Sequence, residues 1–357
     1  MPEIAKAAGL RYVTETDPGI RRKKVGRGFS YIGLDGRPIR DPEALKRIKG
    51  LVIPPSWTDV WICPTPNGHI QATGRDAKGR KKYRYHSRYR SIRDETKFDR
   101  MLVFSKLLPR IRSRVEHDVA MSGLSREKVL ATVVWLLEKT LIRVGNDEYA
   151  RENRSFGLTT LRNRHVDVSG YTMRFEFRGK SGVQRSVSIV DRRIASIVQH
   201  CQTLPGQELF KYVDDDGRRQ DVDSGDINQY LRAITDQDVS AKDFRTWVAT
   251  MHAATLLRDV GPAATQSEAK ANIVRVVDQV AERLGNTRAV CRKYYVHPLI
   301  IVGYLAGRVA EAPPEPGTTK RKGRHATLRR DEVAVLEFLE LQKTEGGQGR
   351  LQVQMDD

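Results

Sequence analysis

The spacing of apolar residues changes once along the chain. Over residues 1–92 the apolar runs are short, and Gly, Pro and Asn interrupt them. Runs of this kind occur at 29–32, 51–53 and 60–62. Short apolar runs between turn-forming residues are typical of β-strands. The first part of the chain is therefore predicted to be a small β-rich domain.

From about residue 94 onward the apolar residues adopt a helical spacing. In the clearest helix, Ser125 can cap the start and Gly145 can end the run. Its apolar stripe consists of Val129, Leu130, Val133, Val134, Leu137, Leu141 and Ile142. Arg143 is then expected in the last turn, where a cation also complements the helix dipole.

Two further helices are predicted in the same part of the chain. The first begins at Asp243 or a neighbouring residue. Gly285 stops the second, whose apolar stripe consists of Ile273, Val276, Val277, Val280 and Leu284. Asn286 comes directly after that stop, and a short segment with Tyr294 and Tyr295 follows.

Residues 171–190 alternate between apolar and polar on both sides of the sequence Gly179-Lys180-Ser181-Gly182. Alternation around a glycine-rich turn predicts a β-hairpin that presents Lys180 at its tip. Gly-Lys-Ser also occurs in nucleotide-binding P-loops, but those loops need a Gly where this chain has Arg174. The segment is therefore not assigned to nucleotide binding.

These patterns together predict an α+β fold with two domains. Residues 1–92 form the β-rich domain, and residues 93–310 form a mainly α-helical domain with a β-hairpin or small sheet. Residues 311–357 are assigned to a basic linker and C-terminal tail. The linker is Pro-rich and then basic over 312–325, and residues 328–343 could form one amphipathic helix.

The charge of the chain points to a polyanionic partner. Lys and Arg number 63 against 44 Asp and Glu, which gives a net charge of +19 and a pI near 9.9. Residues 75–93 hold nine Lys or Arg and one Asp, interleaved with Tyr83, Tyr85 and Tyr89. Basic groups neutralise phosphates and tyrosines pack on sugars or bases, so nucleic acid is the simplest partner. A protein that is basic only for solubility, or one that associates with ribosomes, is the alternative.

The cysteines and the apolar runs bear on location. Cys63, Cys201 and Cys291 are far apart and form no disulfide framework, which fits a reducing compartment. The sequence contains no transmembrane-length apolar run and no signal-peptide core at its start. We therefore expect a cytoplasmic protein without a membrane partner.

Five scattered residues have the chemistry of one phosphoryl-transfer site. Arg143 lies in LIRVGNDEYARENRSFGLTTL, Lys180 in FRGKSG, Arg245 in KDFRTW, Asn286 in LGNT and Tyr295 in CRKYYVHP. Guanidinium groups bind phosphate oxygens in a bidentate fashion, a lysine can protonate a leaving oxygen, and a tyrosine can attack phosphorus. No carboxylate or His/Cys group stands at metal-ligand spacing, so no metal or cofactor is expected.

The order, spacing and flanking sequences of these five residues resemble the small type IB DNA topoisomerases of bacteria and viruses. The resemblance covers roughly residues 15–310. It includes a Lys-x-x-Arg-Thr box at 242–246 and a Gly-[His/Asn]-Thr segment at 285–287 that precedes the tyrosine.

The resemblance implies a catalytic role for residues 93–310 and a mechanism without ATP. Tyr295 forms a 3′-phosphotyrosyl bond, Arg143 and Arg245 bind the equatorial phosphate oxygens, and Lys180 is the general acid. Asn286 stands where many members have histidine, and it can still donate one hydrogen bond, without charge. Tyr295 is preferred to Tyr294 because its distance from Asn286 and the following Val-His-Pro match the family pattern.

The resemblance also implies where DNA is bound. Tyr83 matches a family residue that touches DNA near the cleavage site, and its basic neighbours are predicted to bind the backbone. The predicted DNA-binding residues are Tyr83, Arg80, Lys81, Lys82, Arg84 and Lys242. The expected partner is double-stranded DNA of a bacterial nucleoid, held by a monomer or C-shaped clamp. A chain that ends near Val309 is expected to keep its cleavage chemistry, because the tail lies outside the resemblance.

Two other interpretations fit part of the pattern. Tyrosine recombinases share the Arg, Lys, Arg, Tyr chemistry, but they usually carry His-x-x-Arg where this chain has Lys242-x-x-Arg245, and they open with a helical domain. A non-catalytic nucleic-acid-binding protein could use the same basic surface. Relaxation of supercoiled plasmid and a protein attached to the 3′ end would separate these possibilities from a topoisomerase.

Overall fold

The computed structural model describes residues 2–26, 28–77, 79, 81–214, 216–311 and 328–346. The chain forms two compact units, Met1–Asp99 and Arg100–Asp357. The helix α3 (Ser87–Val119) begins in the first unit and continues into the second. The change of pattern near residue 92 therefore falls inside a helix, whose sequence contains no glycine to break it.

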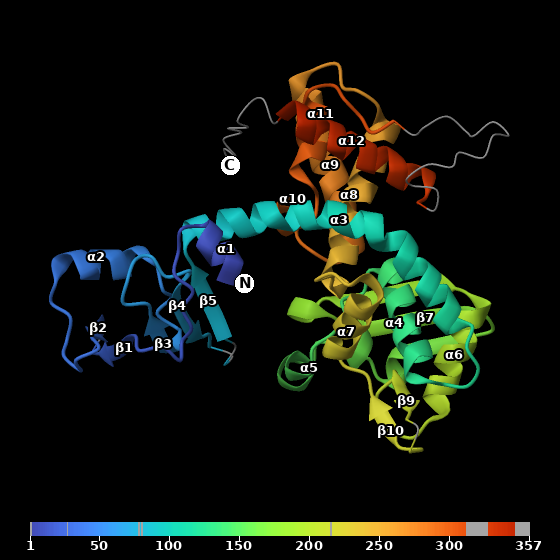
Figure 1. The fold of residues 1–357 in the computed structure, drawn as a ribbon, viewed down its shortest axis with the longest axis horizontal. Coiled ribbons are helices and arrows are strands. Elements are labelled where there is room, and N and C mark those ends of the chain that lie inside the picture. The colour runs from blue at the N-terminus through green and yellow to red at the C-terminus, as the bar shows by residue number, and fades with distance from the viewer. Residues whose placement is uncertain are drawn as a thin grey trace. The chain divides into compact units, whose positions relative to one another are not determined.

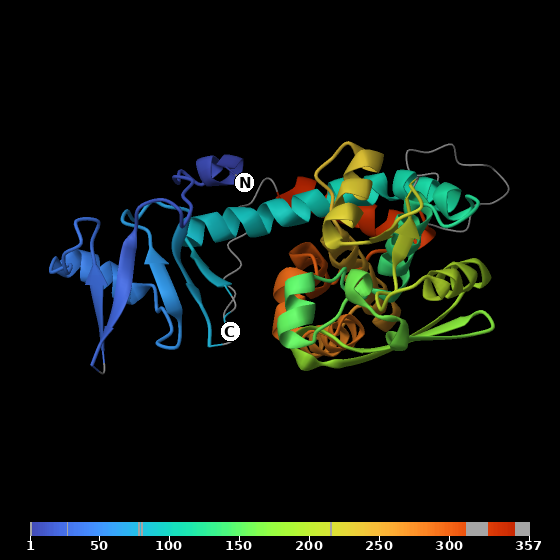
Figure 2. The same ribbon diagram turned by 90° about the horizontal axis from the view of Figure 1, so that it is seen from below.

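The first unit is built on a five-stranded antiparallel sheet in the order β2-β1-β3-β4-β5 (Figures 1 and 2). Helix α2 packs Ile48 against Ile20, Val60 and Ile62 of the sheet. The elements of this unit are α1 (Pro2–Ala7), β1 (Ile20–Val25), β2 (Gly28–Ile32), α2 (Pro42–Gly50), β3 (Thr58–Ile62), β4 (Ile70–Arg75) and β5 (Lys81–Tyr85).

Two of the three apolar runs predicted as strands are confirmed. Residues 29–32 lie in β2 and residues 60–62 in β3. The run at 51–53 is not a strand, because the chain turns there at the end of α2 and Val52 takes a φ of 48°. Leu51 and Ile53 still pack against the core, so the run is apolar because of burial rather than because of sheet pairing.

The second unit is mainly helical, as predicted, and α8 lies at its centre. This helix contacts α4, α7, α9, α11 and α12, and it buries Phe244 and Trp247. Among the described residues, no helix is both long and apolar enough to cross a membrane. The helices of the unit are α4 (Arg126–Thr140), α5 (Asp147–Asn153), α6 (Arg192–Thr203), α7 (Ser224–Thr235), α8 (Ala241–Val260), α9 (Gln266–Leu284), α10 (Arg288–Tyr294), α11 (Pro298–Leu305) and α12 (Arg330–Gly346), with single 3₁₀ turns at Leu158–Thr160, Asn163–His165 and Lys180–Gly182.

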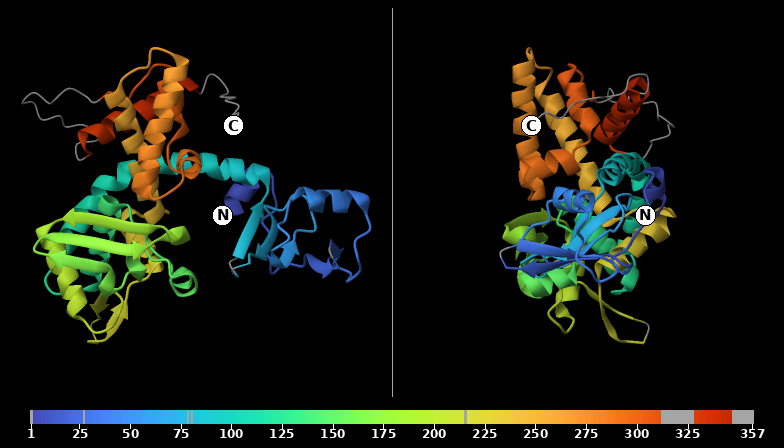
Figure 3. Two further views of the ribbon diagram at one scale, coloured as in Figure 1. Left: turned by 180° about the vertical axis from the view of Figure 1, so that it is seen from behind. Right: turned by 90° about the vertical axis from the view of Figure 1, so that its left-hand side faces the viewer.

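A small antiparallel sheet, β6-β7-β8, stands against these helices (Figure 3, left panel). The predicted hairpin is confirmed by the pairing of β7 with β8, in which Arg178 stands opposite Gln184. Alternate residues Met173, Phe175 and Phe177 are buried, on a strand that contacts α6. The strands of the unit are β6 (Val166–Ser169), β7 (Thr172–Arg178), β8 (Gln184–Val190), β9 (Lys211–Val213) and β10 (Arg219–Asp221).

The predicted end of α4 is wrong by several residues. The helix stops at Thr140, because Leu141 adopts a left-handed conformation with φ 56°. The next segment pairs with the chain around residue 158 instead, where the Leu158 N–H donates to the Arg143 carbonyl at 2.8 Å. Arg143 therefore lies beyond the helix, in a loop, and not in its last turn.

The C-terminal helix α12 belongs to the core of the second unit. The predicted helix at 328–343 is confirmed, and it buries Val335, Leu336 and Leu339. Its Glu332 forms an ion pair with Arg112 at 2.6 Å. A chain that ends near Val309 would expose the surface that α12 covers. That such a chain keeps its cleavage chemistry stays a prediction. The basic linker residues 312–325 lie outside the described residues.

Replacing Leu339 by Ala is expected to lower the free energy of unfolding by about 2–5 kcal/mol, because the deletion leaves a cavity in a packed core. Leu339 is 0% exposed, whereas Leu341 on the same helix is 55% exposed and provides the matched control. Leu341→Ala should change stability by no more than about 0.5 kcal/mol. Urea unfolding followed by circular dichroism measures both. Equal effects of the two substitutions would show that α12 is not part of the core.

Candidate active site

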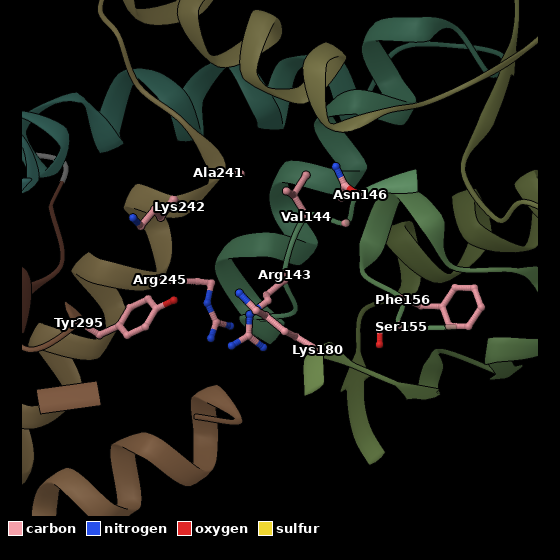
Figure 4. A pocket seen from close by; sticks show the side chains of 11 residues that line it. Arg143, Val144, Asn146, Ser155, Phe156, Lys180, Ala241, Lys242, Arg245 and Tyr295 are labelled. Carbon is pink, nitrogen blue, oxygen red and sulfur yellow. The ribbon is translucent and has the colours of Figure 1, made fainter. Parts of the chain in front are cut away.

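A cavity of about 280 Å³ opens in the second unit (Figure 4). It is lined by Arg143, Val144, Gly145, Asn146, Ser155, Phe156, Lys180, Ala241, Lys242, Arg245 and Tyr295. Four of these side chains are basic and none is a carboxylate, so the cavity suits an anion. Four of the five predicted catalytic residues line it together, namely Arg143, Lys180, Arg245 and Tyr295, and so does Lys242.

Arg245 lies in the second turn of α8 and is only 4% exposed. One terminal nitrogen donates to the Leu141 carbonyl beyond the end of α4, and the other donates to the Leu284 carbonyl at the end of α9, at 2.8 Å. Burial, followed by the positive charge of Arg143, lowers the pKa of Arg245 to about 10. Within the described part of the chain no carboxylate forms an ion pair with it.

Two buried hydrogen-bond donors near the cavity have no partner among the described residues. They are Nε of Arg245 and Nδ2 of Asn286. The Asn286 Oδ1 accepts a hydrogen bond from Arg143, which fixes the amide with its donor on the other side. Buried donors in native structures are nearly always paired, so both donors are available to an acceptor that enters from outside the protein.

Close packing of two glycines places Arg143. Gly145 has a φ of 116°, and a Cβ on it would lie 2.7 Å from the Thr159 hydroxyl. A Cβ on Gly157 would lie 2.5 Å from the Arg143 carbonyl oxygen. The loop after α4 therefore packs directly against residues 157–160. This packing fixes the backbone of Arg143, whose side chain lines the cavity.

Lys180 stands at the turn of the β7–β8 hairpin. Ser181 and Gly182 follow with φ values of 64° and 82°, and the Gly179 N–H donates to the Val183 carbonyl at 2.7 Å. The tight turn brings an exposed lysine to the rim of the cavity, where Figure 4 shows it reaching into the space beside Arg143 and Arg245.

Tyr295 follows α10, and its backbone is held from α8. The buried hydroxyl of Thr250 donates to the Tyr295 carbonyl at 3.0 Å and accepts from the His297 N–H at 3.1 Å. The Arg245 guanidinium lies 5.4 Å from the centre of the Tyr295 ring, and the tyrosine hydroxyl points toward it (Figure 4). Tyr294 does not line the cavity and lies beside Lys293.

The environment of Tyr295 favours its ionised form. Burial alone would raise the pKa of the phenol, but the positive charges of Arg245 and Arg143 and a hydrogen bond from Arg245 outweigh it. The pKa of Tyr295 is therefore lowered from the ordinary value near 10. A tyrosine with a lowered pKa is a better nucleophile at neutral pH.

Four of the predicted DNA-binding residues lie on β5 of the first unit, namely Lys81, Lys82, Tyr83 and Arg84. Tyr83 is 43% exposed and stacks on Tyr85, with ring centres 5.8 Å apart. Their basic neighbours have protein partners: Lys81 pairs with Glu15, Lys82 with Asp76, and Arg84 donates to the Val52 carbonyl. Arg80 lies outside the described residues. The structure thus shows an exposed tyrosine, Tyr83, between lysines whose positive charges are partly compensated by acidic residues.

Sequence patterns gave no indication of two residues that support this site. Thr250 holds the Tyr295 backbone, and Arg185 on β8 donates to the Glu282 and Arg283 carbonyls at the end of α9. Each lies in a regular element and belongs to no motif. Only the meeting of distant segments reveals them. Among the described residues, no group of His, Cys, Asp or Glu is arranged to hold a metal ion.

Comparison with known proteins gives the family. Residues 86–300 match the family model for the eukaryotic DNA topoisomerase I catalytic core, and residues 28–76 match that for the bacterial DNA topoisomerase IB N-terminal domain. DNA topoisomerase 1B of Acanthamoeba polyphaga mimivirus is 32% identical over 285 residues, which cover 78% of this chain and 85% of that protein. DNA topoisomerase 1B of Vaccinia virus (strain Copenhagen) is 24% identical over 234 residues, 64% of this chain and 70% of that protein.

A two-domain α+β chain with a tyrosine facing clustered arginines is a DNA strand-cleaving enzyme of the tyrosine-nucleophile class. More specifically, the chain belongs to the type IB DNA topoisomerases, isomerases that relax supercoiled DNA without ATP. This assignment replaces the recombinase and the non-catalytic interpretations.

Replacing Arg245 by Met is expected to raise the pKa of Tyr295, because the largest stabilising charge is lost while the ring stays buried. Carbon-13 NMR of protein labelled at tyrosine Cζ measures the titration, and Tyr295→Phe identifies the signal. Lys293→Met, beside Tyr294, is the control and should leave the midpoint unchanged. A Tyr295 midpoint that does not rise in Arg245→Met would show that this arginine does not set the pKa.

Proposed function

We propose that Tyr295 is the residue that cleaves DNA, in a site formed with Arg143, Lys180, Arg245 and Asn286. One observation carries the proposal: Arg245 beside this tyrosine, and Asn286, which accepts from Arg143, each keep a buried donor without a partner among the described residues. A phosphodiester supplies nonbridging oxygens that would satisfy both donors. The same oxygens carry the negative charge that the cationic cavity favours.

The roles follow from the order in which bonds change. Tyr295 loses its proton to solvent and attacks phosphorus as the phenolate, so that its oxygen becomes bonded to the 3′ phosphate, while the 5′-oxygen leaves with a proton from Lys180. Arg143 and Arg245 bind the nonbridging oxygens throughout, and Asn286 donates through Nδ2. Resealing is the reverse: the 5′-hydroxyl attacks, its proton returns to Lys180, and the tyrosine leaves. The phosphotyrosyl bond keeps the energy of the broken linkage, so no second substrate is consumed.

Preorganised charge accounts for the catalytic power of such a site. Donors that already point at the developing charge need no reorganisation during the reaction, and removal of one typically costs a factor of about 100–1,000. Arg245 is held by carbonyls at the ends of two helices, so it cannot turn away. Lys180 is on an exposed turn instead, which suits a group that must approach the leaving oxygen and exchange its proton with solvent.

The first unit is proposed to bind the duplex opposite the catalytic unit, so that a monomer closes around DNA as a clamp. The exposed ring of Tyr83 and the basic residues beside it support this role, and Lys242 extends the binding surface next to the cavity. The match of residues 28–76 to a bacterial N-terminal domain supports a bacterial source and action on the nucleoid in the cytoplasm.

Tyr295→Phe should abolish relaxation and adduct formation, because it removes only the attacking oxygen. DNA affinity should be retained, since the cationic groups remain. Plasmid relaxation without ATP and a denaturing gel of end-labelled DNA measure the two activities, and a filter-binding titration measures the affinity.

Tyr294→Phe is the matched control for this test. It removes the same atom from the adjacent ring, which does not line the cavity, and should relax plasmid at the native rate. If Tyr295→Phe relaxes plasmid normally and Tyr294→Phe does not, the nucleophile is Tyr294 and the proposal is wrong.

Lys180→Ala is expected to slow cleavage by about 100- to 10,000-fold, the usual contribution of general acid catalysis. A substrate with sulfur in place of the bridging 5′-oxygen has a leaving group that needs no proton. On that substrate Lys180→Ala should cleave nearly as fast as the native enzyme. Single-turnover cleavage of the two substrates gives the comparison.

Arg245→Ala serves as the control for the sulfur experiment. Its role is confined to the nonbridging oxygens, so sulfur at the bridging position should not rescue it. If sulfur leaves the Lys180→Ala defect unchanged, the lysine only binds phosphate and another group supplies the proton.

A further inference from the structure

Arg185 on β8 does not line the cavity, yet it touches the backbone of two segments that present proposed catalytic groups. A Cβ added to Gly179 would lie 3.2 Å from Cγ of Arg185, so the arginine stem runs along the residue before Lys180. A Cβ added to Gly285 would lie 2.6 Å from its Nη1, so the guanidinium abuts the residue before Asn286. One side chain thus spans the two turns.

The guanidinium also completes the end of α9. The last carbonyls of a helix lack partners within the helix. Here the Asn286 N–H donates to the Ala281 carbonyl at 2.9 Å, while Arg185 donates to Glu282 at 3.3 Å and to Arg283 at 2.9 Å. Arg245 donates to the fourth carbonyl, that of Leu284. Two arginines, one inside the cavity and one behind it, therefore hold the helix end from which Asn286 projects.

The positive charge of Arg185 interacts with the carbonyls at this helix end. Among the described residues, no carboxylate forms an ion pair with it. A cation near the C-terminus of a helix is stabilised by the helix dipole. Burial, followed by the positive charge of Arg143, lowers the pKa of the guanidinium. The two terminal nitrogens of Arg185 donate to two adjacent carbonyls. An arginine suits this position because its guanidinium holds two donors at a fixed spacing on a long side chain.

We propose that Arg185 is a positioning residue of the cleavage reaction, which ties the hairpin turn of Lys180 to the α9 end that carries Asn286. The proposal rests on the roles given to Lys180 and Asn286 under the proposed function. The turn itself is exposed at Lys180. Without Arg185, the turn and the helix end can shift relative to each other, and a misplacement of about 1 Å can cost roughly 100-fold in rate.

The test is single-turnover cleavage at saturating DNA by Arg185→Ala, alone and combined with Lys180→Ala or Asn286→Ala. Arg185→Ala should cleave roughly 10- to 100-fold more slowly than the native enzyme. In either combined variant its added loss should be much smaller, because the group that it positions is already absent. On the sulfur substrate, part of the Arg185→Ala defect should disappear, since the placement of Lys180 no longer matters.

Two further variants make the result specific. Arg174 lies on β7 of the same hairpin, and in the part of the chain that the structure describes its ion pair is with Glu176 on its own strand. Arg174→Ala is therefore the matched control and should cleave at the native rate. Arg185→Lys keeps the stem and the charge but loses the fork, and its rate should fall between those of Arg185→Ala and the native enzyme. If Arg185→Ala does not fold, the same combinations made with Arg185→Lys carry the test.

The possible outcomes distinguish a failure of the Arg185 proposal from a failure of the proposed function on which it rests. Arg185→Ala cleavage within about twofold of native would overturn the role of Arg185 alone. So would an equal loss in every background and on both substrates, because a residue that only stabilises the fold acts independently of Lys180 and Asn286. Native rates in the single variants Lys180→Ala and Asn286→Ala would overturn the proposed catalytic roles, and the role of Arg185 with them.

Discussion

The site depends on one buried cation, Arg245, that has no carboxylate partner among the described residues. Arg245 is 4% exposed, and its terminal nitrogens bond to backbone carbonyls at the ends of α4 and α9. A guanidinium placed in this way keeps its charge uncompensated, which is costly in the free protein and lowers its pKa to about 10. The cost is offset by packing elsewhere, and it leaves an electrostatic field that a phosphodiester can use.

The local irregularities of the fold are explained by this constraint. Leu141 adopts a left-handed conformation, and the carbonyl that it turns out accepts from Arg245. Gly285 is also left-handed at the end of α9, and the carbonyl of the residue before it, Leu284, accepts from Arg245. Helix ends leave free carbonyls, which are good partners for a guanidinium. Carbonyls at two helix ends therefore bind the guanidinium in place of acidic residues. A carboxylate at the same position would neutralise the cation and weaken the binding of an anion.

The rest of the second unit holds these ends in place. Helix α8 carries Arg245 near its start and Thr250 further along, so a single rigid element fixes the cation and the backbone of Tyr295. Helix α12 covers α8 and α11, where Phe338 lies so close to Gly303 that a Cβ there would be 2.4 Å from the ring. The segment that follows Tyr295 is thus held in place by a part of the chain far from it in sequence.

The sequence determined much of the local structure and the chemical identity of the site. Periodicity predicted the helices, alternation around Gly179 and Lys180 predicted the hairpin, and the order of Arg, Lys, Arg, Asn and Tyr indicated phosphoryl transfer. The helices and the hairpin depend on neighbours within a few residues, which a sequence displays directly, whereas the site was indicated by residue types and the short motifs around them.

Only the tertiary structure decided how these pieces meet. The stop of α4 at Thr140, the unpaired donors of Arg245 and Asn286, and the bridge formed by Arg185 all arise from contacts between segments distant in sequence. The same is true of α12, whose pattern predicted a helix but not its place in the core. Hydrogen-bond partners and burial are properties of the packed chain, so no local pattern could have specified them.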